Sequence, residues 1–500
     1  MKIKSSFTTQ VIPFFTQKKV LVVASVLVLL VVLAVLYLGQ FMSNTQRIYF
    51  TEDGFKPNEI TIQKGSVVIF KNKSDDAFWP ASNVHPTHSA YPDFDPKKPI
   101  ASGGSWSFTF TESGIYRFHD HINSNFEGVI TVTDTKGSVA KLNCSEEKNV
   151  QCWESLILNT LKVDGIEAAF QVLINLSETE PLFTKDCHGY AHLIGEEAYN
   201  LYVANENFEL TPATALCGYG FYHGFMETML LTTGDIQEAR DFCEMADQKL
   251  AGQASAAATA CYHGTGHGAV DGSDPTAWGD VEAMMEPGFT LCTALAQTDL
   301  QLYLCNTGVF NATEVISHDP KYKIEYIHED PFAVCNAQSL DRREACYSNM
   351  IPLLITKFSN DVDAMLEYTN ERMIDNEKPA IDGHTINELV TIGIMFEFMR
   401  LYGTDPDYAQ NGIELCRRQN EDDHLACVEG LSGGHIKYGP PGKGYIKNIE
   451  FCKLELLTEE ERDSCYKYLL SRLSSNYSLE KTQEICQMID VQYAKRYCMY

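Results

Sequence analysis

Hydrophobic and polar residues follow three different patterns along the chain. Residues 20–38 (VLVVASVLVLLVVLAVLYL) are apolar and carry no charge. Residues 46–134 contain short segments of alternating apolar and polar side chains, typical of half-buried β-strands; examples are EITIQ (59–63), SVVIFK (66–71), SWSFTF (105–110), IYRFH (115–119) and GVITV (128–132). Over residues 140–500 apolar side chains recur at three- and four-residue steps, which predicts helices. The patterns therefore predict a multi-domain protein with a single transmembrane helix, an all-β domain and an all-α domain.

Residues 20–38 have the length and composition of a membrane-spanning helix. At 1.5 Å per residue such a helix is about 28 Å long, close to the hydrocarbon thickness of a bilayer. Four lysines precede the segment, whereas Arg47 is the first basic residue after it. The positive-inside rule then predicts a cytoplasmic tail at 1–19 and an extracytoplasmic location for the bulk of the chain. Since no small-residue cleavage site follows, we interpret the segment as an uncleaved single-pass anchor in the cell membrane.

The charge balance bears on the possible partners. The chain has 67 acidic and 39 basic side chains, a formal net charge of −28. A chain this acidic repels phosphate backbones, so we expect no nucleic-acid partner. No P-loop or HExxH segment occurs, and the loose matches GLSGG and GTGHGA lack the strand–turn–helix context that their chemistry requires.

All 16 cysteines lie after residue 140, mostly in closely spaced pairs. An extracytoplasmic location favours disulfides, and the absence of CxxC spacing argues against zinc; free buried thiols remain the alternative. Successive pairs start 34–49 residues apart, with one double step, which predicts a solenoid-like array of helical repeats. The pairs that we expect are Cys144–Cys152, Cys187–Cys217, Cys243–Cys261, Cys292–Cys305, Cys335–Cys346, Cys416–Cys427, Cys452–Cys465 and Cys486–Cys498.

The segment 46–134 resembles a known family. The order GFKPNEITIQKGSVVIFKNKS, SGGSWSFTFTESGIYRFHDH and FEGVITV is similar to that of the cupredoxins, the plastocyanin and azurin type of copper domain. The resemblance implies a small β-sandwich with a copper site. The positions of the usual Cys, His and Met ligands hold Asp120, Asn123 and Phe126 instead. Without a thiolate the His₂Cys blue-copper site cannot form, so we do not carry over fast one-electron transfer.

Four histidines nonetheless cluster in this segment. His85 and His88 lie in NVHPTHSAY, and His119 and His121 lie in FHDH. Residues two apart on a regular strand share a face, and the resemblance implies that the HPTH loop reaches the same end of the sandwich. Imidazoles suit copper or zinc, and a planar nitrogen-rich set favours Cu(II). We therefore predict copper in a variant HPxH…HDH cupredoxin subclass; the alternative is four histidines on surface loops.

The helical region carries a second group of metal-capable side chains. They lie in CHGYAH (187–192), CGYGFYHGFME (217–227) and CYHGTGH (261–267), each phrase with two such groups four positions apart and therefore on one helix face. Together they could supply a second, one- or two-metal site. The alternative is that these glycine-rich phrases only allow close helix packing. The candidate ligands are His188, His192, His223, Glu227, His263 and His267.

Three functions follow from these observations. The first is a membrane-anchored extracytoplasmic copper-binding protein that holds copper, delivers it or takes part in its redox chemistry. Its expected partners are the membrane and an envelope protein or a donor of electrons or copper. The second is a metal-dependent enzyme whose site lies in the helical domain. The third is an envelope scaffold or interaction protein. The sequence leaves open whether the chain is an enzyme.

Overall fold

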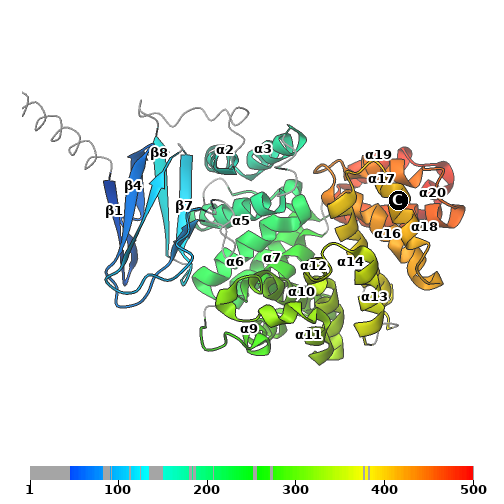
Figure 1. Cartoon of the computed structure of the whole chain (residues 1–500). Coiled ribbons are helices and arrows are strands. Elements are labelled where there is room, and N and C mark those ends of the chain that lie inside the picture. The colour runs from blue at the N-terminus through cyan, green and yellow to red at the C-terminus, as the bar shows by residue number, and fades with distance from the viewer. Residues whose placement is uncertain are drawn as a thin grey trace, which may run out of the picture. The chain divides into compact units, whose positions relative to one another are not determined.

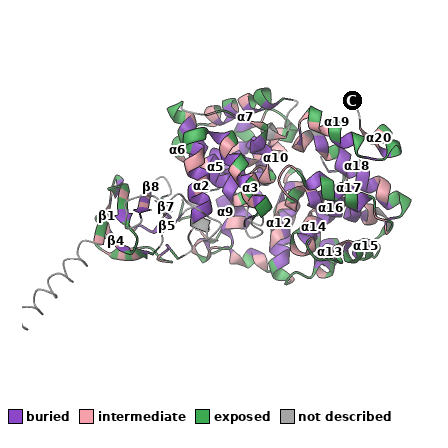
Figure 2. Cartoon of the chain, turned by 90° about the horizontal axis from the view of Figure 1, so that it is seen from above, coloured by how far each residue is buried: buried purple, intermediate pink, exposed green. Residues whose placement is uncertain are grey.

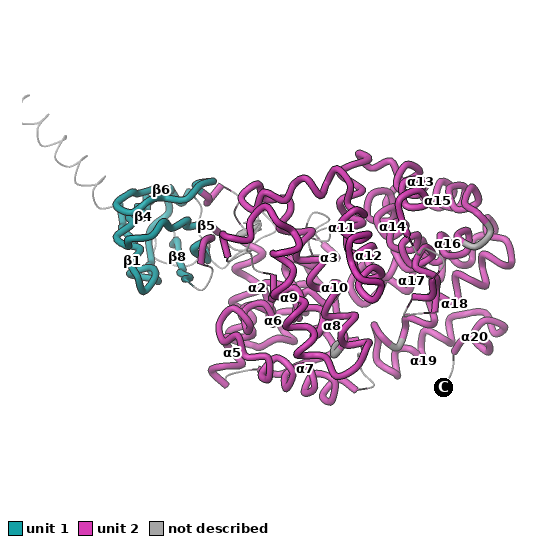
Figure 3. Tube along the Cα trace, turned by 90° about the horizontal axis from the view of Figure 1, so that it is seen from below, with its two compact units in different colours: residues 1–81, 96–120, 126–141 teal, residues 82–95, 121–125, 142–500 magenta. Residues whose placement is uncertain are grey.

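The computed structural model divides into two compact units (Figure 3). Unit 1 contains residues 1–81, 96–120 and 126–141, and unit 2 contains residues 82–95, 121–125 and 142–500. The predicted anchor at 20–38, His85 and His88 lie outside the described residues. Within the described part, no helix is long and apolar enough to cross a membrane. The structure describes residues 45–82, 91, 93–111, 114–123, 126–133, 150–179, 183, 187–205, 208–251, 256–270, 274–374, 378–380 and 383–498.

The alternating segments form a sandwich of two four-stranded sheets (Figure 1). The strand order is β2-β1-β4-β6 in one sheet and β3-β8-β7-β5 in the other. In each sheet one pair is parallel, β1 with β4 and β3 with β8. The strands are β1 (Thr45–Thr51), β2 (Gly54–Lys56), β3 (Glu59–Gln63), β4 (Ser66–Asn72), β5 (Pro80–Ser82), β6 (Ser105–Phe110), β7 (Gly114–Asp120) and β8 (Glu127–Thr133).

Aromatic side chains fill the sandwich core. Phe50 stacks on Phe78 with ring centroids 4.9 Å apart, and Phe55 meets Phe118 edge to face at 4.8 Å. These residues are buried, and aromatic pairs in such geometries add about 1 kcal/mol beyond the burial of their area. The period-two alternation is clearest in β4 and β8, where every second residue is buried, as the sequence predicts.

The helical region is an array in which long helices contact one another in chain order. The contacts run α5–α6–α8–α10–α12–α14–α16–α18, and the other helices of this stretch lie between them in sequence. Their buried faces form one continuous core (Figure 2), as expected of stacked helical pairs. The helices are α2 (Val150–Asp164), α3 (Ile166–Thr179), α5 (Cys187–Ala204), α6 (Gly220–Thr233), α7 (Ile236–Leu250), α8 (Ala257–Gly268), α9 (Val281–Leu295), α10 (Asp299–Ile316), α11 (Pro331–Ala337), α12 (Leu340–Lys357), α13 (Val362–Arg372), α14 (Ile386–Tyr402), α15 (Tyr408–Cys416), α16 (Glu421–Tyr438), α17 (Gly444–Cys452), α18 (Glu459–Asn476), α19 (Leu479–Gln487) and α20 (Val491–Tyr497).

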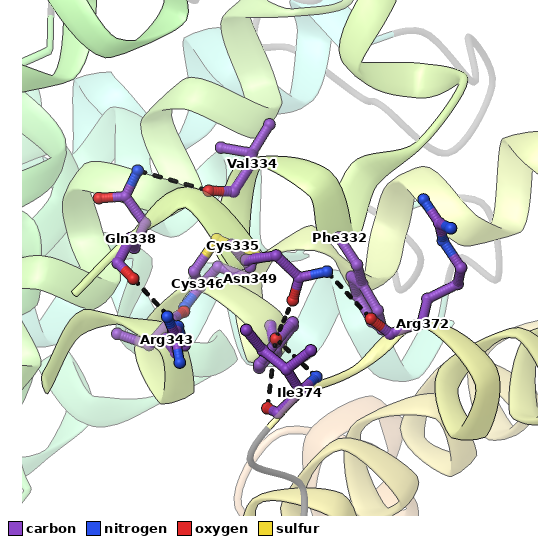
Figure 4. The surroundings of a disulfide bond; sticks show 12 residues. Phe332, Val334, Cys335, Gln338, Arg343, Cys346, Asn349, Arg372 and Ile374 are labelled. Atoms are coloured by element: carbon purple, nitrogen blue, oxygen red, sulfur yellow. Dashed lines mark hydrogen bonds between the residues drawn. A yellow bond between two sulfur atoms is a disulfide. The ribbon is translucent and has the colours of Figure 1, made fainter. Parts of the chain in front are cut away.

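Seven of the eight expected disulfides are confirmed. Most join a short helix to the long helix that follows, as Cys335 of α11 joins Cys346 of α12 (Figure 4). Each such link stabilises the fold by about 2–4 kcal/mol. Cys152 is also disulfide-bonded; its expected partner, Cys144, lies outside the described residues, so that pair stays a prediction.

Candidate metal sites

The first candidate site lies at the end of β7. His119 is the last-but-one residue of this strand, opposite Glu127 of β8, and it is buried. The strand ends at Asp120, so His121 does not continue the regular strand on which its shared face with His119 would depend. Asp120 is buried, and its Oδ1 accepts a hydrogen bond from the backbone N–H of Trp79 at 2.6 Å.

His121 is buried and belongs to the compact unit that contains the helices. Its Nε2 lies 3.3 Å from Oδ2 of Asp319, and Nζ of Lys321 donates to its carbonyl oxygen at 3.3 Å. Burial raises the pKa of Asp319, but His121 and Lys321 outweigh burial, so the pKa is lowered. A carboxylate beside an imidazole orients the ring, which is the arrangement that commonly supports a metal-binding histidine.

The second candidate site lies within unit 2, where α5, α6 and α8 bring six side chains together. We call this set the histidine cluster. Its first layer contains the first residue of each four-residue pair, His188, His223 and His263. The second layer contains the partner four positions later, His192, Glu227 and His267.

Distances within the histidine cluster are short. In the first layer the ring centroid of His223 is 4.9 Å from that of His188 and 4.7 Å from that of His263. In the second layer Oε2 of Glu227 lies 3.1 Å from Nε2 of His192 and 3.8 Å from Nδ1 of His267. The layers also approach each other, since the ring centroids of His223 and His267 are 5.4 Å apart. The structure thus brings together the six helical residues that the sequence singled out.

Glycines allow the helices that carry the cluster to approach closely. A Cβ atom on Gly220 would come within 2.4 Å of the carbonyl oxygen of His188, and one on Gly224 within 2.0 Å of that of His192. Because both partner numbers rise together, α5 and α6 run in the same direction. On the other side of α6, a Cβ on Gly268 would lie 2.7 Å from Cα of Glu227. Backbone contact therefore sets the register that aligns the two layers.

Several imidazole nitrogens of the cluster form hydrogen bonds with groups outside it. Nδ1 of His188 is 2.9 Å from the carbonyl oxygen of Cys217, and Nδ1 of His263 is 2.7 Å from Oγ1 of Thr307. Nδ1 of His192 is 3.0 Å from Oε1 of Glu196. Sequence reasoning missed Glu196 and Thr307. Glu196 lies four residues beyond His192, and Thr307 takes the place in CNTG that His263 has in CYHG, so the repeat itself was the available signal.

The charges in the cluster are divided unevenly. Burial lowers the pKa of His192, but the carboxylates of Glu196 and Glu227 outweigh it and raise the pKa to about 10. Burial and neighbouring histidines lower the pKa of His263 to about 3 and that of His223 well below its usual value. At neutral pH the cluster therefore contains one imidazolium between two carboxylates and several neutral imidazoles, which are the form that binds metals.

As they stand, the described His, Cys, Asp and Glu side chains form no set of three that is ready to hold a metal ion. Two atoms of the cluster are nevertheless buried without a hydrogen-bond partner among the described residues, Oε2 of Glu227 and Nδ1 of His267. Buried polar atoms in this state are rare in native proteins and call for an explanation.

Comparison with known proteins decides the family of the sandwich. A family model described as a cupredoxin-like domain matches residues 24–132. The sandwich is a cupredoxin-like domain. No curated protein matches the chain.

Solved structures similar to the cupredoxin-like domain include a cupredoxin, a plastocyanin and a multicopper oxidase. A purple cupredoxin from Nitrosopumilus maritimus is 17% identical, with 18% of this chain and 99% of that chain covered and a TM-score of 0.16. Oxidised plastocyanin from Dryopteris crassirhizoma is 18% identical, with 17% and 99% covered and a TM-score of 0.15. The multicopper oxidase mgLAC is 16% identical, with 18% and 39% covered and a TM-score of 0.14.

A thiolate copper site does not fit the cupredoxin-like domain. The chain has no cysteine before Cys144. At the positions of the usual Cys and Met ligands, Asp120 is engaged with the backbone of Trp79 and the ring of Phe126 packs against Phe50 with centroids 5.6 Å apart. The donors that fit copper here are imidazoles. Of the four predicted ligands the structure describes His119 and His121.

Proposed function

We propose that the cupredoxin-like domain binds copper through imidazoles, with His119 and His121 as ligands and His85 and His88 completing the set. The observation that carries this proposal is the pair of buried histidines at the end of β7 in a domain matched by the cupredoxin model. Buried imidazoles without a thiolate favour a Cu(II) site with nitrogen ligands rather than a blue-copper centre. Bound copper would supply one-electron chemistry; the residues of the chain would hold it and keep it from solvent.

We further propose that the chain presents this domain outside the cytoplasm from a membrane anchor at 20–38, where it holds or delivers copper. The uncharged segment preceded by lysines supports an anchor. The seven disulfides support an oxidising compartment. A partner that donates or accepts copper or electrons would belong to the same envelope.

Copper content of the full chain, purified in detergent, tests the copper proposal. We expect about one Cu(II) per chain with an electron paramagnetic resonance signal from nitrogen ligands and no intense thiolate-to-copper absorption. H119Q and H121Q should each weaken copper binding by at least about 100-fold, since even groups that only orient a ligand contribute 10- to 100-fold. The matched control is H318N, because His318 lies half-exposed on the helical unit. Copper binding that is unchanged in H119Q and H121Q would refute the proposal.

A further inference from the structure

The second layer of the histidine cluster has incomplete hydrogen bonding at its centre. Oε2 of Glu227 lies 3.1 Å from Nε2 of His192, within ion-pair distance but outside hydrogen-bond geometry, and Nδ1 of His267 has no hydrogen-bond partner among the described residues. The side chains of Glu227 and His267 are about nine-tenths buried, with exposed fractions of 10% and 11%. A buried polar atom without a partner is unfavourable, so a further partner beside Nδ1 of His267 would stabilise the folded state.

The spacing of the three donor atoms matches a small metal ion. Ligand atoms at the 2.0–2.2 Å bond lengths of a tetrahedral zinc site lie roughly 3.3 Å from one another. The distances of 3.1 Å from Glu227 Oε2 to His192 Nε2 and 3.8 Å to His267 Nδ1 lie on either side of this value. The third separation is wider, since the ring centroids of His192 and His267 are 6.3 Å apart, so these two rings would have to move toward each other around the ion.

The surroundings of these atoms also suit a metal ligand set. Metal-binding histidines usually give their second ring nitrogen to a carboxylate or a carbonyl, and Nδ1 of His192 is 3.0 Å from Oε1 of Glu196. Close backbone contact at Gly224 and Gly268 fixes α5, α6 and α8 around the three donors. The ring of His223 lies beside them, with its centroid 6.4 Å from that of His192 and 5.4 Å from that of His267.

We propose that His192, Glu227 and His267 form a second metal site, independent of the cupredoxin-like domain, that binds a divalent first-row transition metal such as Zn²⁺ in place of the proton that His192 otherwise carries. Glu196 is a positioning residue that orients His192. Two imidazoles and one carboxylate are the ligand type of catalytic zinc and non-haem iron sites. His188 and His263, which form the first layer together with His223, do not bind this ion.

Zinc binding in a variant that lacks the first site tests this proposal separately from the copper proposal. The full chain carrying H119Q and H121Q, purified in detergent, is dialysed against micromolar Zn²⁺ and its metal content measured. We expect at least one bound Zn²⁺ per chain and a rise in melting temperature on addition of Zn²⁺, since an ion that binds only the folded state stabilises it. Absence of Zn²⁺ from this variant would refute the second site and leave the copper proposal untouched.

Further substitutions in the same background identify the ligands. E227Q keeps the shape of the side chain but removes its charge, and H267N removes one imidazole; each should weaken Zn²⁺ binding by at least about 100-fold and abolish the shift in melting temperature. E196Q should weaken binding about 10- to 100-fold. H318N is the matched control, because His318 is not a member of the histidine cluster and its Nε2 pairs with Oε1 of Glu314 at 2.9 Å. Equal Zn²⁺ affinity in E227Q, H267N and H318N would overturn the ligand assignment.

Discussion

Two buried glutamates on long helices of the same unit differ in how their oxygens are satisfied. Glu429 of α16 is 4% exposed, and both of its oxygens have partners: Nε2 of His384 at 2.7 Å and Oγ of Ser464 at 2.8 Å. Glu227 of α6 is 8% exposed, but its Oε2 has two close imidazoles and no well-formed hydrogen bond among the described residues. Since native proteins satisfy most buried polar groups, Glu429 has a structural role, whereas Glu227 has the features of a binding site.

Glycines in two parts of the helical unit also differ in the atoms that they contact. In the histidine cluster, a Cβ on Gly224 would meet the backbone carbonyl oxygen of His192 at 2.0 Å. On α14, a Cβ on Gly393 would meet only Cδ1 of Ile351 at 2.4 Å, with the next atom at 3.9 Å. A terminal methyl group can rotate away, but a helix backbone cannot. A side-chain movement can therefore relieve the close contact at Gly393 but not the one at Gly224.

The largest effect should come from breaking this close approach. G224A should destabilise the helical unit by about 3 kcal/mol or more because two helix backbones must separate. G393A should change stability by less than about 1 kcal/mol, because relief of strain at Ile351 is offset by the better helix propensity of alanine. Urea denaturation followed by helical circular dichroism measures both. Similar midpoints for the two variants would show that the cluster does not depend on backbone contact.

The two glutamates themselves provide the next test. E429Q should cost about 2–3 kcal/mol, because it weakens charge-assisted hydrogen bonds to His384 and leaves a buried amide with imperfect partners. Without added metal, E227Q should cost less than E429Q, since His192, the close partner of Glu227, keeps its pairing with Glu196. The same denaturation experiment, in the presence of a chelator, gives both values. A larger loss for E227Q than for E429Q would mean that Glu227 is a structural residue.

A third carboxylate, Glu461 of α18, extends the comparison to pH. Burial raises its pKa, but hydrogen bonds from Arg417, the Thr458 backbone and His424 outweigh burial and lower the pKa to about 2. A lowered pKa in the folded state adds stability above the unfolded value near 4.3, and this contribution is lost as the pH falls toward 2.

E461Q should therefore lower the free energy of unfolding by about 2 kcal/mol at neutral pH. Between about pH 4.5 and pH 2.5, where the folded and unfolded pKa values of Glu461 differ, E461Q should lose less stability than the wild type. Melting temperatures across this range check the prediction. E480Q is a suitable control because Glu480 is an exposed residue in the first turn of α19. Parallel pH profiles for the wild type and E461Q would contradict the assigned role of Glu461.

Much of this arrangement is predictable from local sequence, because it depends on local periodicity. The alternation at 59–63 and 105–110 coincides with β3 and β6, and the cysteine spacing gives the disulfides between consecutive helices. The i,i+4 spacing places His188 and His192 on one face of α5. The resemblance to cupredoxins likewise identifies the sandwich from its strand motifs.

Contacts between distant segments are not predictable in this way. Asp319 lies beside His121 although about 200 residues separate them, and Thr307 meets His263 from another helix. These pairs depend on the path of the whole array rather than on any local pattern. The hydrogen bond between Asp120, the last residue of β7, and the backbone of Trp79 is likewise not encoded by the alternation.

The smallest expected effect concerns Thr307, whose hydroxyl supports the first layer of the cluster. Oγ1 of Thr307 lies 2.7 Å from Nδ1 of His263, whereas Oγ1 of Thr313, on the same helix, bonds only the carbonyl oxygen of Val309 at 2.8 Å. T307V and T313V remove the same hydroxyl, but only T307V takes a partner from an imidazole. Because the Val309 carbonyl belongs to the helix ladder, its loss costs little, so T307V should cost about 1 kcal/mol more than T313V. Equal losses of stability in T307V and T313V, measured by urea denaturation, would show that His263 does not need Thr307. Helix α10 would then contribute only packing to the histidine cluster.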